Sequence, residues 1–395
     1  MMKNNAVLVA MGRSAIGKAP KGTLRYTRPE ELASQVLQGV LAQLPDLPQG
    51  QIDDLILGCA MPEAEQGLNV ARMIALKAGL GESTPGQTIN RFCASGLQSI
   101  AIAANTITSR QNDIVIAGGL ESMSALPMGG NMMRPDPGLI KNSPHVYDSM
   151  GITAENVAAK YHISRENQDA FSVRSHVRAY EAAGNGKFVE EIIPVYADVI
   201  EKTENGRTVT NKIIFDKDEG IRPDSSIEAL AKLKPIFKVK GSVTPGNSSQ
   251  TSDGAAFVVM MSEDNAKAFG YQPIAKLIGY SVVGVPPDLM GIGPIYAIPK
   301  VLQRNGLTLK DIDLIELNEA FASQSIACIN ELGLNIDKVN VNGGAIALGH
   351  PLGCTGTVLT IKLLQELRRR GQKRGIVSMC IGGGMGAAGV FELIG

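Results

Sequence analysis

The chain lacks tryptophan and has few other aromatic residues, with eight tyrosines and nine phenylalanines among 395 residues. A nucleic-acid surface that stacks bases on aromatic side chains therefore has little to be built from. The 38 basic residues equal the 38 acidic ones, which argues against both a basic nucleic-acid-binding face and an acidic tail. We expect no nucleic-acid partner, although this balance does not exclude small anionic ligands.

Cysteine is also scarce. The chain has five cysteines, an odd number, and none are spaced as C-x-x-C, so the pattern indicates neither a disulfide framework nor a zinc ribbon. No apolar run is long enough to span a bilayer. The first ten residues lead into a predicted strand and lack the apolar core and cleavage site of a signal peptide. We therefore expect a cytoplasmic protein in a reducing compartment, with no membrane contact.

Glycine, in contrast, is abundant: the 44 glycines predict a tightly packed α/β enzyme with many close backbone approaches. The length allows two or three domains, or two similar halves. Three sequence parallels favour a duplicated β-α-β unit, with active residues where strands end and helices begin. The alternative is a single larger α/β sheet. The parallel segments are Asp54-Leu-Ile with Asp313-Leu-Ile, Ile89-Asn90 with Val341-Asn342, and Asp113-Ile-Val with Gly375-Ile-Val.

The segment 127–246 differs from its surroundings. Proline, methionine and asparagine cluster first, two helices are predicted over 153–162 and 164–183, and a charged, β-rich stretch follows. We interpret this segment as an insertion or lid over a core. The predicted organisation is a first core half over 1–126, the insertion over 127–246, a return to the first half over 247–271, and a second core half over 272–395.

The segment T-I-N-R-F-C-A-S-G-L-Q-S-I, residues 88–100, predicts an apolar strand, a sharp turn at Cys93 and the start of a helix. At a first helical turn, unpaired N–H groups and the helix dipole favour a thiolate over a thiol. Cys93 is therefore a candidate nucleophile. The alternative is a small buried hydrophobic residue, which is the usual role of cysteine in intracellular proteins.

His350 lies between Gly349 and Pro351, on a stiff turn that fixes the direction of its imidazole. The other three histidines fall in the segment 127–246, in no comparable setting. We predict that His350 is the functional histidine. A metal site shared with Cys354 is not expected, because proline and glycine interrupt a regular helix there and no second ligand pair is evident.

Cys380 ends a predicted strand and enters the glycine-rich bend C-I-G-G-G-M-G, whose N–H groups can form an oxyanion hole. A dinucleotide fingerprint is disfavoured, because no helix follows to receive a pyrophosphate. Asn318 lies at the end of another predicted strand, where its amide can position a water or a reacting oxygen. A helix cap is the alternative for Asn318. The remaining cysteines, Cys59, Cys328 and Cys354, are predicted packing residues.

Four motifs together resemble the thiolase family, of the acetyl-CoA acyltransferase kind: N-R-F-C-A-S-G-L-Q-S-I, N-E-A-F-A-S, G-G-A-I-A-L-G-H-P-L-G-C-T-G and C-I-G-G-G-M-G-A-A. The resemblance covers essentially the whole chain. It implies a five-layered α-β-α-β-α fold of two duplicated halves with an inserted loop domain, and a homodimer or homotetramer. It also implies CoA thioesters as substrates, with coenzyme A as a substrate, no permanently bound cofactor and no metal.

Carried over by motif, the resemblance implies that Cys93 takes the acyl group, His350 activates it, and Cys380 handles the proton of the acetyl α-carbon. Asn318 would hold a water, and the N–H groups of Cys93 and Gly382 would form a second oxyanion hole. The resemblance further implies a set of residues that contact coenzyme A or line the substrate pocket: Met150, Arg222, Phe237, Ser249 in the loop 244–249, Met290 and Phe321.

Two departures bear on the type of thiolase. Ser149 stands where biosynthetic acetoacetyl-CoA thiolases usually carry a histidine, and the loop Gly-Asn-Ser-Ser-Gln over 246–250 replaces their Gly-Asn-Ala-Ser-Gly. Both features are similar to the degradative 3-ketoacyl-CoA branch, which implies thiolytic cleavage in fatty acid β-oxidation. The alternatives are an acetyl-CoA C-acetyltransferase working in condensation and a non-catalytic acyl-CoA-binding protein. Cys380 disfavours a condensing ketosynthase.

Overall fold

Ten strands form one sheet in the computed structural model, which describes residues 5–203 and 205–394. The strand order is β10-β11-β12-β9-β1-β8-β5-β3-β4, and β2 pairs with β8 beside this path. The two halves of the sheet join through a single residue pair, Leu8 with Ala275. The strands are β1 (Ala6–Arg13), β2 (Gly17–Lys18), β3 (Asp54–Gly58), β4 (Gly86–Ile89), β5 (Ile114–Ser122), β8 (Ser252–Ser262), β9 (Ala275–Gly284), β10 (Leu314–Leu317), β11 (Arg374–Ile381) and β12 (Met385–Leu393).

The strand pairing repeats on the two sides of the junction between β1 and β9. In the N-terminal half, β3 is parallel to β4 and β5, and β8 is antiparallel to β5 and β1. In the C-terminal half, β10 is parallel to β11, and β12 is antiparallel to β11 and β9. The predicted duplication is therefore confirmed. The alternative of a single larger sheet holds for the hydrogen bonding alone, because the pair of Leu8 and Ala275 joins all ten strands, while each half keeps its own parallel strands at its outer edge.

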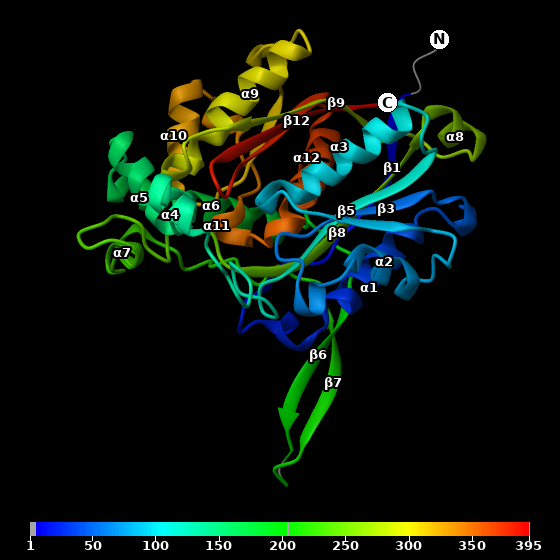
Figure 1. The fold of residues 1–395 in the computed structure, drawn as a ribbon, viewed down its shortest axis with the longest axis horizontal. Helices are drawn as coiled ribbons and strands as arrows, with labels where there is room; N and C mark the ends of the chain where they lie inside the picture. The colour runs from blue at the N-terminus through cyan, green and yellow to red at the C-terminus, as the bar shows by residue number, and fades with distance from the viewer. Residues whose placement is uncertain (1–4, 204, 395) are drawn as a thin grey trace.

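Two helices, α3 (Ser95–Thr108) and α12 (Leu352–Arg370), lie between the two halves of the sheet (Figure 1). α12 is buried continuously from Leu352 through Leu367, as expected for a helix with sheets on both sides. Two further pairs of helices cover the outer faces, so the predicted five layers are confirmed. These helices are α1 (Pro29–Leu41) with α2 (Val70–Lys77), and α9 (Gly293–Arg304) with α10 (Ala322–Leu332).

The central strands read as continuous apolar runs because helices cover both of their faces. Every residue of β1, β5 and β8 is buried. The outer helix α1, in contrast, buries one stripe that includes Leu32, Val36 and Val40, and exposes part of its opposite face. The core therefore lies on the two inner and two outer faces of the sheets, and the strand ends are left to carry polar side chains.

The inserted segment adds helices and a two-stranded hairpin that projects from the body of the molecule (Figure 1). A buried ion-pair group ties it to β1, because the Arg13 guanidinium lies 2.9 Å from Glu191 and 2.8 Å from Asp218. The boundaries that we predicted for the insertion stay a prediction. Its elements are α4 (Pro137–Asn142), α5 (Met150–Lys160), α6 (Arg165–Gly184), β6 (Val195–Lys202), β7 (Thr208–Phe215) and α7 (Ile227–Ala231).

The counterpart of β4 in the second half is not a strand. It makes only the single bridge between Ile315 and Val339. Asn340 has a φ of 47°, and its side chain accepts the N–H of Leu317 at 2.9 Å and donates to the Leu317 carbonyl at 2.8 Å. A side-chain amide thus takes the place of a neighbouring strand at the end of β10. The chain then enters the short helix α11 (Ala345–Leu348).

One further helix, α8 (Glu263–Ala268), follows β8 before the chain crosses to the second half. Within residues 5–203 and 205–394, no helix combines the length and apolar character needed to cross a bilayer. In the same residues, no three His, Cys, Asp or Glu side chains are grouped closely enough to hold a metal ion.

Candidate active site

Cys93 lies in a 3₁₀ turn, Phe92–Ala94, directly before α3. Ser95 holds this turn from inside, because its hydroxyl donates to the Phe92 carbonyl at 2.7 Å and accepts the Arg91 N–H at 2.8 Å. The Cys93 side chain is 7% exposed and packs in an apolar cluster. The predicted strand–turn–helix geometry is therefore present. The cluster around Cys93 includes Ala60, Met123 and Leu352, with Met61 and Ala19 at its edge.

The expectation that the start of the helix favours a thiolate at Cys93 is wrong for the free protein. Burial raises the pKa of the Cys93 thiol to about 11, although the N–H groups of Gly382 and of Cys93 itself act in the opposite direction. Desolvation of the charged form outweighs two backbone donors, because the surroundings are apolar. At neutral pH the resting side chain is a thiol, and a base must take its proton before it can attack.

His350 is held by its backbone on the turn between α11 and α12. Its N–H donates to the Gln250 carbonyl and to the Ser252 hydroxyl, both at 3.1 Å. The preceding Gly349 has a φ of +112°, and a Cβ there would lie 2.3 Å from the Ser252 hydroxyl oxygen. Only glycine fits at this position, so the turn against β8 sets the direction of the imidazole.

The hydrogen bonds of the His350 ring select one tautomer. The Thr355 hydroxyl donates to the Pro351 carbonyl at 2.8 Å, so His350 Nδ1, 2.6 Å from that hydroxyl, carries the proton and donates to it. Nε2 is then an acceptor, and the Asn318 amide nitrogen lies 3.3 Å away. Burial lowers the pKa of His350 to about 4. The ring is therefore neutral at pH 7, with an Nε2 that can accept a proton.

Asn318 follows β10, and its N–H donates to the Ser378 carbonyl of β11 at 2.9 Å. It does not cap α10, because that helix begins at Ala322 with Phe321 as its N-cap residue. The amide oxygen of Asn318 is buried and has no hydrogen-bond partner within the described chain. A buried acceptor without a partner is costly unless a ligand or a water satisfies it. This geometry fits the water-holding role that the resemblance implies.

Cys380 is fully buried near the end of β11. Burial, together with the nearby Cys93, raises the pKa of the Cys380 thiol well above its usual value. Four of the residues expected at the substrate pocket pack with Cys380 in one apolar cluster, and the rings of two of them meet edge to face with centroids 6.3 Å apart. These four residues are Met150, Phe237, Met290 and Phe321.

Gly382 connects the two cysteine environments. Its N–H group lies close enough to the Cys93 sulfur to lower the pKa of that thiol. A Cβ at Gly382 would lie 3.7 Å from both Met150 Sδ and Phe92 Cδ2, so its surroundings include Met150 of the Cys380 cluster and Phe92 of the Cys93 turn. The structure thus brings Cys93, Gly382 and Cys380 together from opposite halves of the chain. It brings His350 beside Asn318, and it seats Leu352, two residues after His350, against Cys93.

Two residues expected to contact coenzyme A lie outside the apolar cluster. The N–H of Ser249 donates to the Ala320 carbonyl at 2.9 Å, which keeps its loop beside the Asn318 segment. The Arg222 side chain is exposed, and its backbone N–H donates to Nδ1 of His176 at 3.2 Å. His176 lies within α6 and not on a glycine–proline turn like that of His350, but it is also buried, and burial lowers its pKa to about 4.

Sequence reasoning missed two buried carboxylates at this site. Glu121, at the end of β5, accepts the N–H groups of Ala60 and Gly353, each at 2.8 Å. It thereby joins the wall of the Cys93 cluster to the start of α12, and burial raises its pKa. Glu319, next to Asn318, is also buried with a raised pKa. The only feature of the sequence that pointed to either carboxylate was its place at the end of a predicted strand. That place does not show whether the side chain is buried.

The three remaining cysteines behave as predicted. Cys59, Cys328 and Cys354 are free and buried in three different core clusters. Burial raises the pKa of each thiol, and for Cys328 the value is about 12. Such thiols are poor nucleophiles at neutral pH. Of these thiols and that of Cys93, Cys93 has the smallest rise in pKa, to about 11.

Comparison with known proteins agrees with this geometry. Residues 6–264 match the family model described as Thiolase, N-terminal domain, and residues 271–393 match Thiolase, C-terminal domain. The chain is 54% identical over 388 residues to a 3-ketoacyl-CoA thiolase of Bacillus subtilis (strain 168), covering 98% of this chain and 99% of that protein.

Two solved structures have the same fold with a TM-score of 0.89. One is the acetyl-CoA acetyltransferase of Bacillus anthracis, 41% identical and covering 99% of both chains. The other is the dimeric peroxisomal thiolase of Saccharomyces cerevisiae, 40% identical and covering 100% of this chain and 98% of that one.

Proposed function

Because the chain belongs to the thiolase family and is an acyltransferase, we propose that it is a 3-ketoacyl-CoA thiolase. In this proposal it cleaves a 3-ketoacyl-CoA with coenzyme A and releases acetyl-CoA and an acyl-CoA shortened by two carbons. Coenzyme A is a substrate, and no permanently bound cofactor takes part. The pathway that such a reaction serves is fatty acid β-oxidation.

The first half-reaction begins at Cys93. His350 Nε2 takes the thiol proton, and the sulfur attacks the keto carbon of the substrate. The bond between the α-carbon and the keto carbon breaks, its electrons pass to the acetyl-CoA enolate, and Cys380 supplies a proton to the α-carbon. The acyl group remains on Cys93 as a thioester.

The second half-reaction transfers the acyl group to coenzyme A. Cys380, now a thiolate, takes the proton of the incoming coenzyme A thiol, and the new thiolate attacks the acyl-cysteine. The bond from the acyl carbon to Cys93 breaks, and the Cys93 thiolate takes back the proton that His350 removed in the first step. Asn318 and the protonated His350 stabilise the enolate oxygen of the first step, and the N–H groups of Cys93 and Gly382 stabilise the tetrahedral oxyanion of the second. Removing one such donor typically costs about 10²- to 10³-fold in rate.

The observation that carries this proposal is the neutral His350, whose unprotonated Nε2 lies 3.3 Å from the Asn318 amide nitrogen. A thiol with a pKa of about 11 needs a base, and an imidazole with a pKa of about 4 is in its basic form at pH 7. The geometry also disfavours a non-catalytic acyl-CoA binder, which has no use for a base at this position.

Ser149 and the Ser248-Ser249-Gln250 loop support the degradative direction over condensation of two acetyl-CoA molecules. The Gln250 amide donates to the Gly220 carbonyl at 2.9 Å and to the Ile346 carbonyl at 3.2 Å, so it links the Arg222 segment to the turn that precedes His350. A Gly-Asn-Ala-Ser-Gly loop has no side chain to make this link. The relatives carry both kinds of name, 3-ketoacyl-CoA thiolase and acetyl-CoA acetyltransferase.

The decisive experiment compares thiolysis of 3-ketoacyl-CoA substrates from four to sixteen carbons with condensation of acetyl-CoA. We expect kcat/KM for thiolysis of medium chains to exceed that for acetoacetyl-CoA, and mass spectrometry to detect an acyl adduct on Cys93. Activity confined to acetoacetyl-CoA would favour the condensing enzyme instead. Tight acyl-CoA binding without turnover would favour a binding protein.

We also propose that the chain forms a homodimer through the β4 edge. β4 ends the strand order of the described sheet, and the neighbouring α2 exposes Met73 and Leu76, while Leu68 just before it is 93% exposed. An unpaired strand edge flanked by apolar side chains favours pairing with a second copy. Sedimentation of the wild type and of Met73→Glu tests this proposal, and a tetramer is the other predicted assembly.

The cytoplasmic location stays a prediction. One relative is a peroxisomal enzyme, so membership of the family does not decide the compartment. Imaging of the tagged full chain in its source cells would test it, and accumulation of the protein in an organelle would contradict it.

A further inference from the structure

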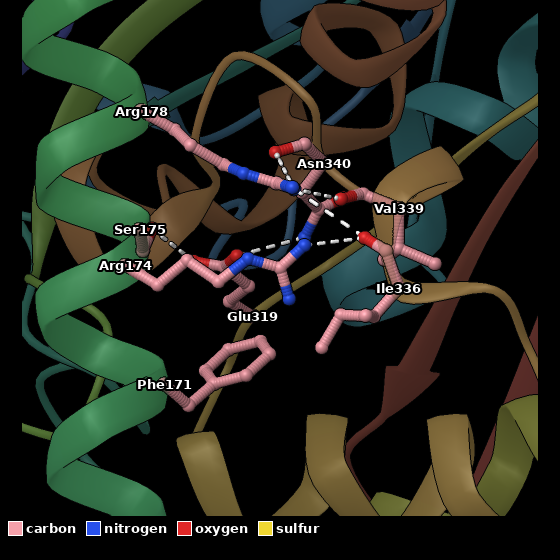
Figure 2. A pocket seen from close by; sticks show the side chains of 8 residues that line it. All are labelled: Phe171, Arg174, Ser175, Arg178, Glu319, Ile336, Val339 and Asn340. Atoms are coloured by element: carbon pink, nitrogen blue, oxygen red, sulfur yellow. Dashed lines mark hydrogen bonds between the residues drawn. The ribbon is translucent and has the colours of Figure 1, made fainter.

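Glu319 is a buried carboxylate with three hydrogen-bond donors from three separate segments. The Ser175 hydroxyl of α6 donates to it at 2.6 Å, the Asn340 amide at 2.8 Å and the Ile346 N–H at 3.3 Å. Only 2% of the residue is exposed. Figure 2 shows Ser175 and Asn340 on either side of the Glu319 carboxylate, in a pocket between α6 and the chain that follows β10.

The hydrogen-bond donors of Glu319 lie in the segments that carry Asn318 and His350, whose side chains meet at His350 Nε2. Asn340 binds the N–H and the carbonyl of Leu317, the residue before Asn318. Leu317 and Glu319 are therefore both fastened to one amide, and Asn318 between them has little freedom to turn. On the other side, Ile346 belongs to α11, which leads into the turn of His350.

Ser175 completes the arrangement. Its oxygen accepts the N–H of Gly344 at 3.1 Å while its proton goes to Glu319, so one hydroxyl joins the carboxylate to the start of α11. The fit is close, because a Cβ at Gly344 would lie 2.2 Å from the Glu319 carboxyl carbon. The carboxylate thus fills the space between the Asn318 segment and the His350 segment.

We propose that Glu319 is a positioning residue, whose carboxylate holds the Asn318 amide against His350 by fastening three segments to one point. The inference rests on the proposed function only for its kinetic consequence. A disordered Asn318 would cost transition-state stabilisation, since small displacements of positioned groups are expensive in rate. It would cost little in binding of coenzyme A, because Glu319 bonds none of the residues expected to contact it.

Glu319→Gln is the sharpest test, because it keeps the volume and changes only donors and acceptors. The Asn340 amide cannot rotate to accept from the new NH₂ group, since its oxygen and nitrogen are both committed to Leu317. If the Gln nitrogen instead takes the place of Oε2, it faces the Ile346 N–H. Either orientation places donor against donor and releases one of the three segments.

We expect Glu319→Gln to lower kcat by about 10- to 100-fold while KM stays within about threefold of the wild type. Asn318→Ala alone should cost about 10²- to 10³-fold. In the Asn318→Ala background, Glu319→Gln should then cost less than about threefold, because residues that act through one another are not additive. Equal losses in both backgrounds would overturn the proposal, as would a kcat of Glu319→Gln within twofold of the wild type.

A second readout does not depend on turnover. In a chain labelled with ¹⁵N at histidine, the Nε2 resonance of His350 reports the hydrogen bond from Asn318. We expect Glu319→Gln to move this resonance in the same direction as Asn318→Ala does. An unmoved resonance would overturn the proposal even if the wild type had no thiolysis activity, and absence of that activity would count against the proposed function alone.

Arg174→Met is the matched control. Arg174 lies beside Ser175 on α6 and binds the Ile336 carbonyl and Asp337, but makes no hydrogen bond to Glu319 (Figure 2). We expect it to lower the melting temperature while leaving kcat and the His350 resonance unchanged. If Glu319→Gln does not fold, Ser175→Ala replaces it, with an expected loss of about two- to tenfold in kcat; no loss there would overturn the proposal.

Discussion

In the N-terminal half, β4 leads within two residues into the turn that places Cys93 at the start of α3, whereas the C-terminal half reaches α12 by a longer route. There the counterpart of β4 is reduced to one bridge at Val339, and the short helix α11 and Gly349 come before His350. Both segments end at the start of a central helix. The comparison shows that the duplicated framework fixes where the reactive groups lie, and the local turns decide which chemistry each half supplies.

The two halves also differ in what burial does to their reactive groups. Burial raises the pKa of Cys93 to about 11 and lowers the pKa of His350 to about 4. Both shifts disfavour the charged form, so each half presents a neutral partner. In the proposed mechanism, the proton therefore passes from the Cys93 thiol to the His350 imidazole only when substrate is bound.

The largest expected effect comes from removing each of the two candidate catalytic thiols by mutation. Cys93→Ala removes the thiol that lies beside Gly382 and packs with Leu352, and should lower thiolysis by about 10⁴-fold or more, with no acyl adduct by mass spectrometry. Cys380→Ser should still acylate on Cys93 but turn over about 10²- to 10³-fold more slowly. An acyl adduct on Cys93→Ala, or undiminished turnover of Cys380→Ser, would contradict the assignment.

The next effect concerns the two glycines beside the reactive groups. Gly349→Ala forces a Cβ into a backbone conformation that favours glycine and to within 2.3 Å of Ser252, so the free energy of unfolding should fall by about 2–3 kcal/mol. Gly382→Ala meets its neighbours at 3.7 Å and should change stability by less than about 0.5 kcal/mol. Denaturant unfolding of both variants measures the difference, and equal stabilities would refute it.

The pH dependence of Cys93 gives a smaller but direct test. With a pKa of about 11, its thiolate fraction should rise about tenfold per pH unit between pH 7 and 10, while His350, with a pKa of about 4, stays neutral throughout. The rate of alkylation by iodoacetamide should follow this slope, after subtraction of the rate for Cys93→Ala. A plateau near pH 8 would instead indicate the thiolate that the helix position alone predicts.

The smallest expected effect is on the alkylation rate of Cys93, and it distinguishes Glu121 in the N-terminal half from Glu319 in the C-terminal half. Burial is the main cause of the raised pKa of Cys93 and the charge of Glu121 is a smaller one, so Glu121→Gln should speed alkylation of Cys93 by at most about threefold at pH 8. The same change places a donor against the N–H groups that Glu121 binds, so thiolysis should fall even as alkylation rises. Glu319→Gln should leave alkylation unchanged. Unchanged alkylation in Glu121→Gln would mean that the carboxyl is uncharged at this pH.

Much of the fold was predictable because its signals are local. Apolar runs predicted the central strands, and the repeated Asp-Leu-Ile and Ile-Val segments predicted the duplication that the strand order of β3, β5, β10 and β11 confirms. The counterpart of β4 was not predictable, because the Asn340 side chain replaces strand pairing there. Strand propensity predicts hydrogen bonds between backbones, whereas here the side chain of Asn340 makes the hydrogen bonds to Leu317.

The turns that carry the candidate site residues were predictable, but the protonation of these residues was not. Turn chemistry around Cys93 and His350 pointed to both residues, since glycine and proline constrain a chain wherever they occur. The buried state of Cys93, and with it the reversal of the expected pKa shift, depends on Ala60, Met123 and Leu352, which lie far away in the chain. The carboxylates of Glu121 and Glu319 and the buried His176 were missed for the same reason.

The sequence by itself determined which side chains are available for chemistry, where the chain turns, and that one β-α-β pattern occurs twice. Only the tertiary structure decided that Cys93 rests as a thiol, that His350 presents Nε2, and that the Glu319 carboxylate joins three segments. The physical reason is that desolvation and hydrogen bonding depend on neighbours that packing brings together, and many of those neighbours are tens to hundreds of residues apart in the chain.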